Sequence, residues 1–272
     1  GKGHGVATIL AEILAHKRVE VEQARRAQPL AELQALAGYH LPRRNFYGAV
    51  AAPHRRGPNV IAEIKRASPS AGLLRADFDP VRIAEQYAAG GADALSVLTD
   101  QRFFGGHLDY LGQVKAAVGL PVLRKDFLVD PYQVHESRAY GADAVLVIME
   151  AVDRRTAAEL VALARELELG VLLEVHTRAA LLAVQDMLPG AQRVGVLLGI
   201  NNRDLETQRV DLATVEQLAP LVAPGWPLVA ESGMKSADDL ARMHAAGARA
   251  VLVGELLMRS GDPTRTLRDL FT

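Results

Sequence analysis

The strongest constraint on the fold is an alternation of short apolar runs with amphipathic stretches from about residue 60 to the end of the chain. Eight such runs occur, at residues 60–65, 94–99, 121–127, 144–149, 170–176, 194–201, 227–233 and 250–254. They are rich in Val, Leu and Ile and almost continuously apolar, as expected for strands that are buried on both faces. The pattern therefore predicts a parallel sheet made of eight strand–helix units.

The segments between the runs have the spacing of helices. Apolar residues recur every three or four positions in segments 153–168 and 211–222, which places them on one helical face. Proline, aspartate and glycine mark the expected ends: helices should begin at Pro80, Pro131 and Asp153 and stop at Gly90, Gly141, Gly170 and Gly247.

Eight such units with short, right-handed connections close most simply into a (β/α)8 TIM barrel, an α/β fold. An open doubly wound sheet is the main alternative, but no glycine-rich phosphate-binding turn follows the first strand. Residues 6–37 precede that strand and carry Ile9, Leu10 and Ile13 at helical intervals. We expect a helical extension packed on the barrel, within a single domain of residues 1–272.

Composition excludes several classes of partner. The net charge is −1, which does not fit a nucleic-acid-binding face or a polybasic membrane patch. We interpret three arginine pairs as solvated surface: Arg25-Arg26, Arg43-Arg44 and Arg55-Arg56. The chain has no cysteine and no apolar run close to the ~20 residues of a membrane span. We therefore expect a cytoplasmic protein without a membrane or nucleic-acid partner.

Lysine is scarce, and the six lysines are Lys2, Lys17, Lys65, Lys115, Lys125 and Lys235. Arginine supplies most of the positive charge. A lysine at the end of a strand therefore indicates a need for an amine that can lose its proton, which a guanidinium cannot do in a protein.

Polar residues gather at the ends of the predicted strands, where barrel enzymes carry their functional groups. Residues two apart on a strand share a face, which groups Ile61 with Glu63 and Lys65, Leu123 with Lys125 and Phe127, and Leu172 with Glu174 and His176. The sixth and seventh runs end in Asn201 and Glu231. Any one of these charges is compatible with a structural ion pair. Together at one mouth, lysines and carboxylates predict acid–base chemistry near neutral pH.

Two glycines predict a phosphate site. Gly233 and Gly254 follow the seventh and eighth runs, where exposed backbone N–H groups and helix N-termini favour anions. Either glycine alone would indicate only a tight turn. The loop at residues 67–79 is longer than most strand–helix connections, which suggests a lid over the mouth, although a surface excursion would have the same length.

At these residues the sequence resembles the indole-3-glycerol-phosphate synthase family. Five segments carry the resemblance in the family's order: residues 61–70, 98–106, 123–127, 199–205 and 231–233. The likeness covers nearly the whole chain. It implies ring closure with decarboxylation and dehydration of 1-(2-carboxyphenylamino)-1-deoxyribulose 5-phosphate to indole-3-glycerol phosphate, in tryptophan biosynthesis. It implies no metal and no organic cofactor.

The resemblance also implies roles for catalytic residues. Lys125 matches the general acid that protonates the sugar carbonyl as the aromatic ring carbon attacks it. Lys65 and Glu63 match the acid and base of the later dehydration. Glu174 and Asn201 match residues that orient these groups and bind the sugar hydroxyls.

The remaining site residues are implied to bind substrate. Phosphate ligands are Ser68, Ser232, Gly233 and Gly254, and Phe104 and Phe127 lie against the anthranilate ring. Glu231 belongs to the polar ring of the site, and Arg203 is a further substrate-binding residue. Glu255 is a departure, since several family members have serine after the last glycine. We expect its backbone N–H to contact the phosphate and its side chain to turn away.

Two other functions fit the same pattern. A Schiff-base aldolase would use Lys125 as nucleophile. A non-catalytic sugar-phosphate-binding barrel would keep Gly233 and Gly254 but would not need two strand-end lysines. In each case the partner is a small sugar phosphate, and we expect a monomer or weak homo-oligomer.

Overall fold

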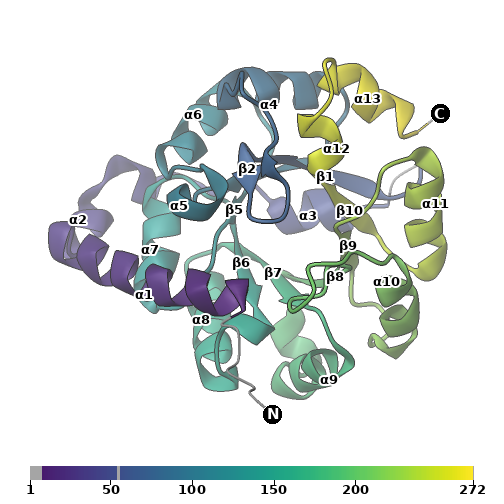
Figure 1. Ribbon diagram of the computed structural model, residues 1–272. Helices are drawn as coiled ribbons and strands as arrows, with labels where there is room; N and C mark the ends of the chain where they lie inside the picture. Colours follow the sequence, from purple (N-terminus) through teal and green to yellow (C-terminus); the bar gives the residue numbers. More distant parts are fainter. Residues whose placement is uncertain (1–7, 54–55, 272) are drawn as a thin grey trace, which may run out of the picture.

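The computed structural model describes residues 8–53 and 56–271, and its centre is a closed barrel of eight parallel strands surrounded by helices (Figure 1). Hydrogen-bonded neighbours follow in chain order: β1 (Asn59–Ile64), β4 (Ala94–Leu98), β5 (Val122–Lys125), β6 (Ala144–Ile148), β7 (Gly170–Val175), β8 (Val196–Asn201), β9 (Leu228–Glu231) and β10 (Ala250–Val253), which pairs with β1. The predicted (β/α)8 barrel is confirmed and the open sheet is wrong.

Each strand lies within or next to a predicted run, but several runs continue beyond the strand they contain. Thr99, Phe127 and Gly233, for example, lie in loops just past the ends of β4, β5 and β9. These loop positions belong to the C-terminal face of the barrel, where side chains and backbone groups are free to serve a site.

Most of the outer helices occupy the segments between the strands: α4 (Pro80–Ala89), α6 (Asp109–Ala117), α7 (Pro131–Ala139), α8 (Arg154–Glu166), α9 (Arg178–Met187), α10 (Ala213–Leu218), α11 (Ala237–Ala246) and α13 (Pro263–Asp269). Shorter pieces are α5 (Gln101–Phe104), α12 (Glu255–Met258) and the 3-10 turns η1 (Ala37–His40), η2 (Met149–Ala151), η3 (Gly190–Arg193) and η4 (Ala219–Leu221).

Most of the expected helix ends are confirmed. Pro80 and Pro131 occupy the first turn, Asp153 caps α8 through the Thr156 N–H, and Gly247 ends α11 at φ 116°. Gly170 as a helix stop is wrong, because Glu168 takes the left-handed conformation at φ 61° and α8 has already ended. The predicted helix at 211–222 is split into α10 and η4 at Pro220, which has no N–H to continue it.

Two apolar layers stabilise the barrel. One fills the space between strands and helices, and the other fills the barrel interior with inward residues such as Ile61, Leu123 and Leu172. A helix that the periodicity did not predict, α3 (Phe46–Ala51), adds Phe46 and Val50 to the interior layer. It lies at the N-terminal ends of the strands, so this end of the barrel is closed.

The N-terminal extension is helical as predicted, with α1 (Ile9–Ala27) and α2 (Leu30–Ala35) packed against α7 (Figure 1). Residues 6 and 7 of the expected extension lie outside the described residues. Between residues 8 and 271, apart from 54 and 55, no helix has the length and apolar character needed to cross a lipid bilayer.

The arginine pair at 43 and 44 is not solvated surface, and that prediction is wrong. The Arg43 guanidinium donates to four carbonyls, of Gly38, Leu41, Arg138 and Ala142, and Arg44 donates to those of Lys115, Val118 and Leu120. Several of these carbonyls lie at the C-terminal ends of α6 and α7, where helical partners are missing. Arg25 and Arg26 are at least 40% exposed, and Arg55 lies outside the described residues.

Candidate active site

A cavity of about 390 Å³ opens at the C-terminal ends of the strands, a volume typical of small-molecule sites. All the predicted site residues except Glu231 line it: Glu63, Lys65, Ser68, Phe104, Lys125, Phe127, Glu174, Asn201, Arg203, Ser232, Gly233, Gly254 and Glu255. Residues from all parts of the chain are thus brought to one mouth.

Glu63, near the end of β1, is the hub of the polar groups. Its Oε2 accepts hydrogen bonds from Lys125 Nζ (3.0 Å) and Ser96 Oγ (2.8 Å), and its Oε1 lies 3.3 Å from Lys65 Nζ. Burial acts to raise the pKa of Glu63, but the two ammonium groups lower it to about 2. The carboxylate is therefore ionised at neutral pH and orients both lysines.

Lys125 ends β5 and points into the cavity beside these carboxylates. Burial acts to lower the pKa of Lys125, but the carboxylates of Glu63 and Glu174 raise it above the usual lysine value. The ammonium therefore keeps its proton at neutral pH. A cation fixed in a largely buried site is suited to protonate an oxygen on which negative charge develops.

Glu174 forms an ion pair with His176, the next inward residue past β7. His176 Nε2 lies 2.7 Å from Glu174 Oε2, and Nδ1 lies 2.8 Å from the Arg203 carbonyl. Both partners only accept hydrogen bonds, so both ring nitrogens must carry protons, as in an imidazolium. Burial lowers the pKa of His176, but Glu174 and Glu150 raise it to about 9, and His176 in turn lowers the pKa of Glu174 to about 2 against the effect of burial.

Glu231 is placed differently from the other acids. It is 1% exposed and lies beside Glu174, outside the cavity lining. No described residue makes a well-formed hydrogen bond to either carboxyl oxygen. Burial and the Glu174 carboxylate raise the pKa of Glu231 well above its ordinary value, so Glu231 is the member of this pair that binds a proton more readily.

The predicted phosphate region consists of turns after β9 and β10. Ser232 (φ 70°) and Gly233 (φ 92°) are both left-handed, which turns the chain sharply at the cavity. Asn201 Oδ1 accepts hydrogen bonds from Ser232 Oγ (2.8 Å) and the Arg203 N–H (2.9 Å). Asn201 thereby ties the loop after β8 to the loop after β9.

Glu255 follows Gly254 and begins α12. It borders the cavity, and its carboxylate pairs with Arg259 Nη2 at 3.1 Å. Its negative charge is therefore offset by a neighbouring cation. That the side chain turns away from a bound phosphate stays a prediction. Arg259 borders the cavity as well and was not predicted.

The other side of the cavity is apolar. The rings of Phe104 and Phe127 have centroids 5.8 Å apart, and α1 contributes Ile9, Leu10 and Ile13 to the lining. The apolar stripe of α1 was visible in the sequence, but a stripe does not reveal which end of the barrel it covers. His176 lies on the inward face, as strand alternation predicted, but no role was predicted for it.

The loop at residues 67–79 contains a small hairpin of β2 (Ala67–Ser68) and β3 (Gly72–Leu73). Ser68, Pro69 and Ser70 line the cavity, and Ser68 Oγ accepts a hydrogen bond from the Ala71 N–H (3.1 Å). The loop lies at the mouth as predicted, while its movement as a lid stays a prediction. Across the described ranges, His, Asp and Glu form no group of three or more suited to a metal ion.

Comparison with known proteins decides among the functions that this geometry allows. The family model described as indole-3-glycerol phosphate synthase matches residues 10–270. The chain belongs to the indole-3-glycerol phosphate synthase family. Its activity is that of the family's carboxy-lyase in tryptophan biosynthesis, as the sequence resemblance implied.

Curated relatives support the same assignment over the full length. The chain is 48% identical to the indole-3-glycerol phosphate synthase of Acidithiobacillus ferrooxidans, over 97% of this chain and 98% of that one. It is also 48% identical to that of Laribacter hongkongensis, over 98% of this chain and 100% of the relative.

Solved structures of more distant proteins share the architecture. The chain resembles a 3-hexulose-6-phosphate synthase with a TM-score of 0.59 at 19% identity, over 79% of this chain and 100% of that one. A thiamine phosphate pyrophosphorylase from Pyrococcus furiosus gives a TM-score of 0.54 at 17% identity, over 79% and 94%. At such identities the likeness concerns the fold alone.

Proposed function

We propose that this cavity closes the indole ring with Lys125 as the general acid. The observation that carries the proposal is the position of Lys125 Nζ, 3.0 Å from Glu63 Oε2, between a polar centre and an apolar wall. Ring closure converts a carbonyl oxygen into an alkoxide. A donor fixed at that oxygen stabilises the transition state more than the ground state.

The two ends of the site set the direction of the substrate. Phosphate fits the turns at Ser232-Gly233 and Gly254, with Ser68 of the hairpin nearby in the lining. The carboxyphenylamino ring fits the wall of Phe104 and Phe127. The phosphate turns follow β9 and β10, and the wall follows β4 and β5, so β1 lies between them in the barrel. The sugar carbonyl then lies near the lysines, with Asn201 and Arg203 beside the hydroxyls.

The chemistry then needs two proton-transfer stages. In the first, the ring carbon attacks the sugar carbonyl, Lys125 protonates the oxygen, and carbon dioxide leaves as the aromatic system is restored. In the second, loss of water forms the indole double bond, with Lys65 as acid and Glu63 as its partner base. Glu174 lines the cavity beside these groups, and we assign it to orient them and to bind a sugar hydroxyl.

The proposed reaction needs no metal and no organic cofactor. The acid, base and anion-binding groups that it requires are all supplied by side chains and backbone of this chain. We infer that residues 1–272 act as one domain, as a monomer or weak homo-oligomer, in the cytoplasm. The partner is a small sugar phosphate, without nucleic acid.

A fluorescence assay tests the function directly. Purified protein is mixed with 1-(2-carboxyphenylamino)-1-deoxyribulose 5-phosphate, and indole-3-glycerol phosphate is followed by its emission. We expect turnover without added metal and no loss of activity after treatment with a chelator. Borohydride should not trap a covalent adduct. An adduct on Lys125 would instead support the Schiff-base alternative.

A further inference from the structure

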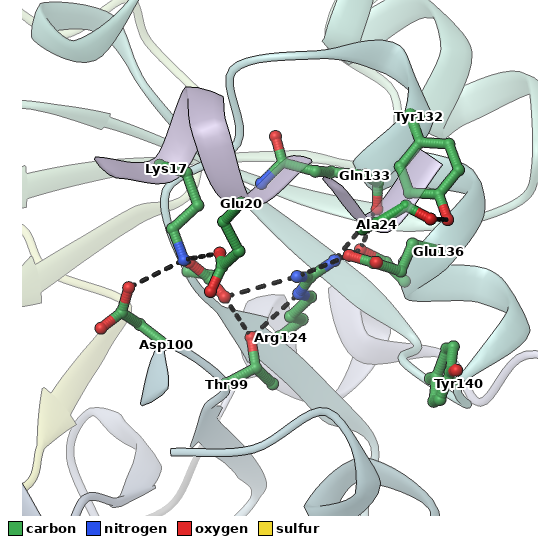
Figure 2. Close-up of polar contacts among 12 residues, drawn as sticks. Lys17, Glu20, Ala24, Thr99, Asp100, Arg124, Tyr132, Gln133, Glu136 and Tyr140 are labelled. Atoms are coloured by element: carbon green, nitrogen blue, oxygen red, sulfur yellow. Dashed lines mark hydrogen bonds and ion pairs between the residues drawn. The ribbon is translucent and has the colours of Figure 1, made fainter. Parts of the chain in front are cut away.

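A lysine outside the cavity, Lys17 of α1, is the centre of a buried ionic cluster. Its side chain is fully buried, and Nζ lies 2.7 Å from Asp100 Oδ2, 2.9 Å from Asp126 Oδ1 and 2.5 Å from Glu20 Oε2 (Figure 2). Burial lowers the pKa of Lys17, but Asp126, Asp100 and Glu20 raise it above the usual lysine value. The ammonium is therefore a permanent cation and the proposed chemistry does not use it.

The cluster extends along β5 to α7. Asp126 Oδ2 accepts hydrogen bonds from Thr99 Oγ1 (2.5 Å) and Arg124 Nη2 (3.3 Å), and Arg124 Nη2 also lies 2.9 Å from Glu136 Oε1 (Figure 2). Arg124 is 3% exposed and points away from Lys125, its neighbour on the strand. One ammonium thus joins α1 to the ends of β4 and β5.

Both aspartates stand next to the aromatic wall of the active site. Asp100 caps α5, accepting the Phe103 N–H at 2.8 Å, and α5 ends in Phe104. Asp126 lies between Lys125 and Phe127 and accepts the Phe127 N–H at 2.7 Å. The helix that carries Lys17 also supplies Ile9, Leu10 and Ile13 to the cavity. Lys17 therefore holds together the three segments that build this wall.

Stability alone does not account for this arrangement. A buried ion pair adds little net stability compared with apolar packing of the same volume, because desolvation of the charges offsets their attraction. It does fix geometry, because removal of one partner leaves the others buried and unpaired. The two loop ends and α1 have no other buried cation in common among the described residues, since Arg124 contacts Asp126 and not Asp100.

We propose that Lys17 is a positioning residue for the aromatic end of the substrate. Its ammonium holds α1 and the segments after β4 and β5 in the arrangement in which Phe104, Phe127 and the apolar face of α1 form one continuous wall. The inference rests on the proposed function, because it assigns this wall to the carboxyphenylamino group. Lys17 does not line the cavity and touches no substrate.

The proposal separates the two ends of the site. Among the described residues, no hydrogen bond or ion pair joins the phosphate turns after β9 and β10 to Lys17 or its carboxylate partners. The Lys125 Nζ is held by Glu63 on β1. Loss of Lys17 should therefore weaken binding of a ring-bearing ligand while binding of a bare phosphate is unchanged.

The test is Lys17→Met, which keeps the aliphatic length of the side chain and removes the charge. We expect KM for 1-(2-carboxyphenylamino)-1-deoxyribulose 5-phosphate to rise at least ~10-fold, equivalent to ~1.4 kcal/mol. Inorganic phosphate should inhibit the variant with the same inhibition constant as the unmodified chain. In the double variant Lys17→Met/Asp100→Asn the lost positive and negative charges balance. It should fold more stably than Lys17→Met and still show the raised KM.

Lys115→Met is the matched control. Lys115, which is partly buried, also pairs with a buried aspartate, Asp143 at 2.5 Å, but Asp143 precedes β6 at the opposite end of the barrel. This variant should lose thermal stability and keep the KM of the unmodified chain.

Several results would overturn the inference. One is an unchanged KM in the folded Lys17 variants, and another is an equal loss of affinity for substrate and phosphate. The same rise of KM in Lys115→Met, or failure of both Lys17 variants to fold, would assign the cluster to stability alone. Absence of turnover by the unmodified chain would instead refute the proposed function, on which the inference depends.

Discussion

Gly199 on β8 lies so close to the carboxyl group of Glu231 that a Cβ at position 199 would come within 2.4 Å of Oε2. Side chains do not tolerate such a contact, and Leu172 Cδ1 closes the same space at 3.1 Å. The absence of a side chain at Gly199 therefore gives Glu231 its place beneath the cavity, next to Glu174.

Gly199→Ala should displace the Glu231 carboxyl group and disturb Glu174 with it. We expect a loss of about 1–3 kcal/mol in the free energy of unfolding, typical of overpacking, together with a lower kcat. Gly119→Ala is the control, because Gly119 has no heavy atom within 4 Å of an added Cβ. Urea unfolding and the fluorescence assay measure the two effects. A fully active, fully stable Gly199→Ala would contradict the assigned geometry.

Glu174 and Glu231 should respond differently to the same chemical change. Glu174→Gln removes an ionised carboxylate and should lower kcat at least ~100-fold, the low end for a positioned acid–base group. Glu231, whose pKa is raised, binds a proton more readily, and Glu231→Gln puts a neutral group of the same shape in its place, so this variant should retain far more activity. Measurement of kcat for both variants at pH 7 tests this difference. Equal losses of kcat would contradict the assignment of the higher pKa to Glu231.

Lys125 is tested by a substitution that keeps its charge. An arginine remains cationic but is a far poorer acid than lysine. We therefore expect Lys125→Arg to lose about as much kcat as Lys125→Ala, at least ~100-fold, with a much smaller effect on substrate binding. If the arginine variant kept near-normal turnover, Lys125 would act only as an electrostatic anchor. The acid would then have to be Lys65 or Glu174.

His176 should make stability depend on pH above neutrality. Its pKa is raised to about 9 in the folded protein by Glu174 and Glu150, against an ordinary value of 6.5. The stabilisation is fully present below pH 6.5 and is lost as pH rises through 9. His176→Asn should abolish this part of the pH dependence and be less stable at pH 6. Urea unfolding at pH 6, 7.5 and 9.5 provides the comparison, and identical pH profiles would count against the ion pair.

Gly233 tests the phosphate end of the site. Its φ of +92° disfavours any side chain, and an added Cβ would lie 2.4 Å from Val210 Cγ1. Gly233→Val should distort the turn after β9 and raise KM more than it lowers kcat, because the phosphate is already bound in the ground state. Steady-state kinetics measure both constants. An unchanged KM would argue against phosphate binding at this turn.

The polar centre of the site could be predicted because two simple rules act together. Alternation along β1 places Glu63 on the inward face, and alternation along β5 does the same for Lys125. The closed barrel brings the inward side chains of these two strands, which are separated by β4, to the same mouth. The ion pair of Glu63 with Lys125 is a direct consequence of both. Strand periodicity and closure of the barrel were both needed, and both could be predicted from the sequence.

Features that depend on a partner far along the chain were missed. Arg43 and Arg44 looked like surface residues because their partners are backbone carbonyls, which leave no mark in a sequence. Lys17 continues the apolar stripe of α1 at helical spacing. No sequence pattern around it indicates its contacts with Asp100 and Asp126, which are distant along the chain. The raised pKa of Glu231 has the same origin, since it depends on burial and on how closely Glu174 approaches.

The filled barrel interior has a kinetic consequence. Phe46 and Val50 of α3, together with Ile61 and Leu123, occupy the space on the N-terminal side of Glu63, so the described residues leave the cavity open at one end only. Substrate, carbon dioxide, water and indole-3-glycerol phosphate must all travel through the same opening. A bound product molecule therefore blocks the entry of the next substrate, and product inhibition should be competitive.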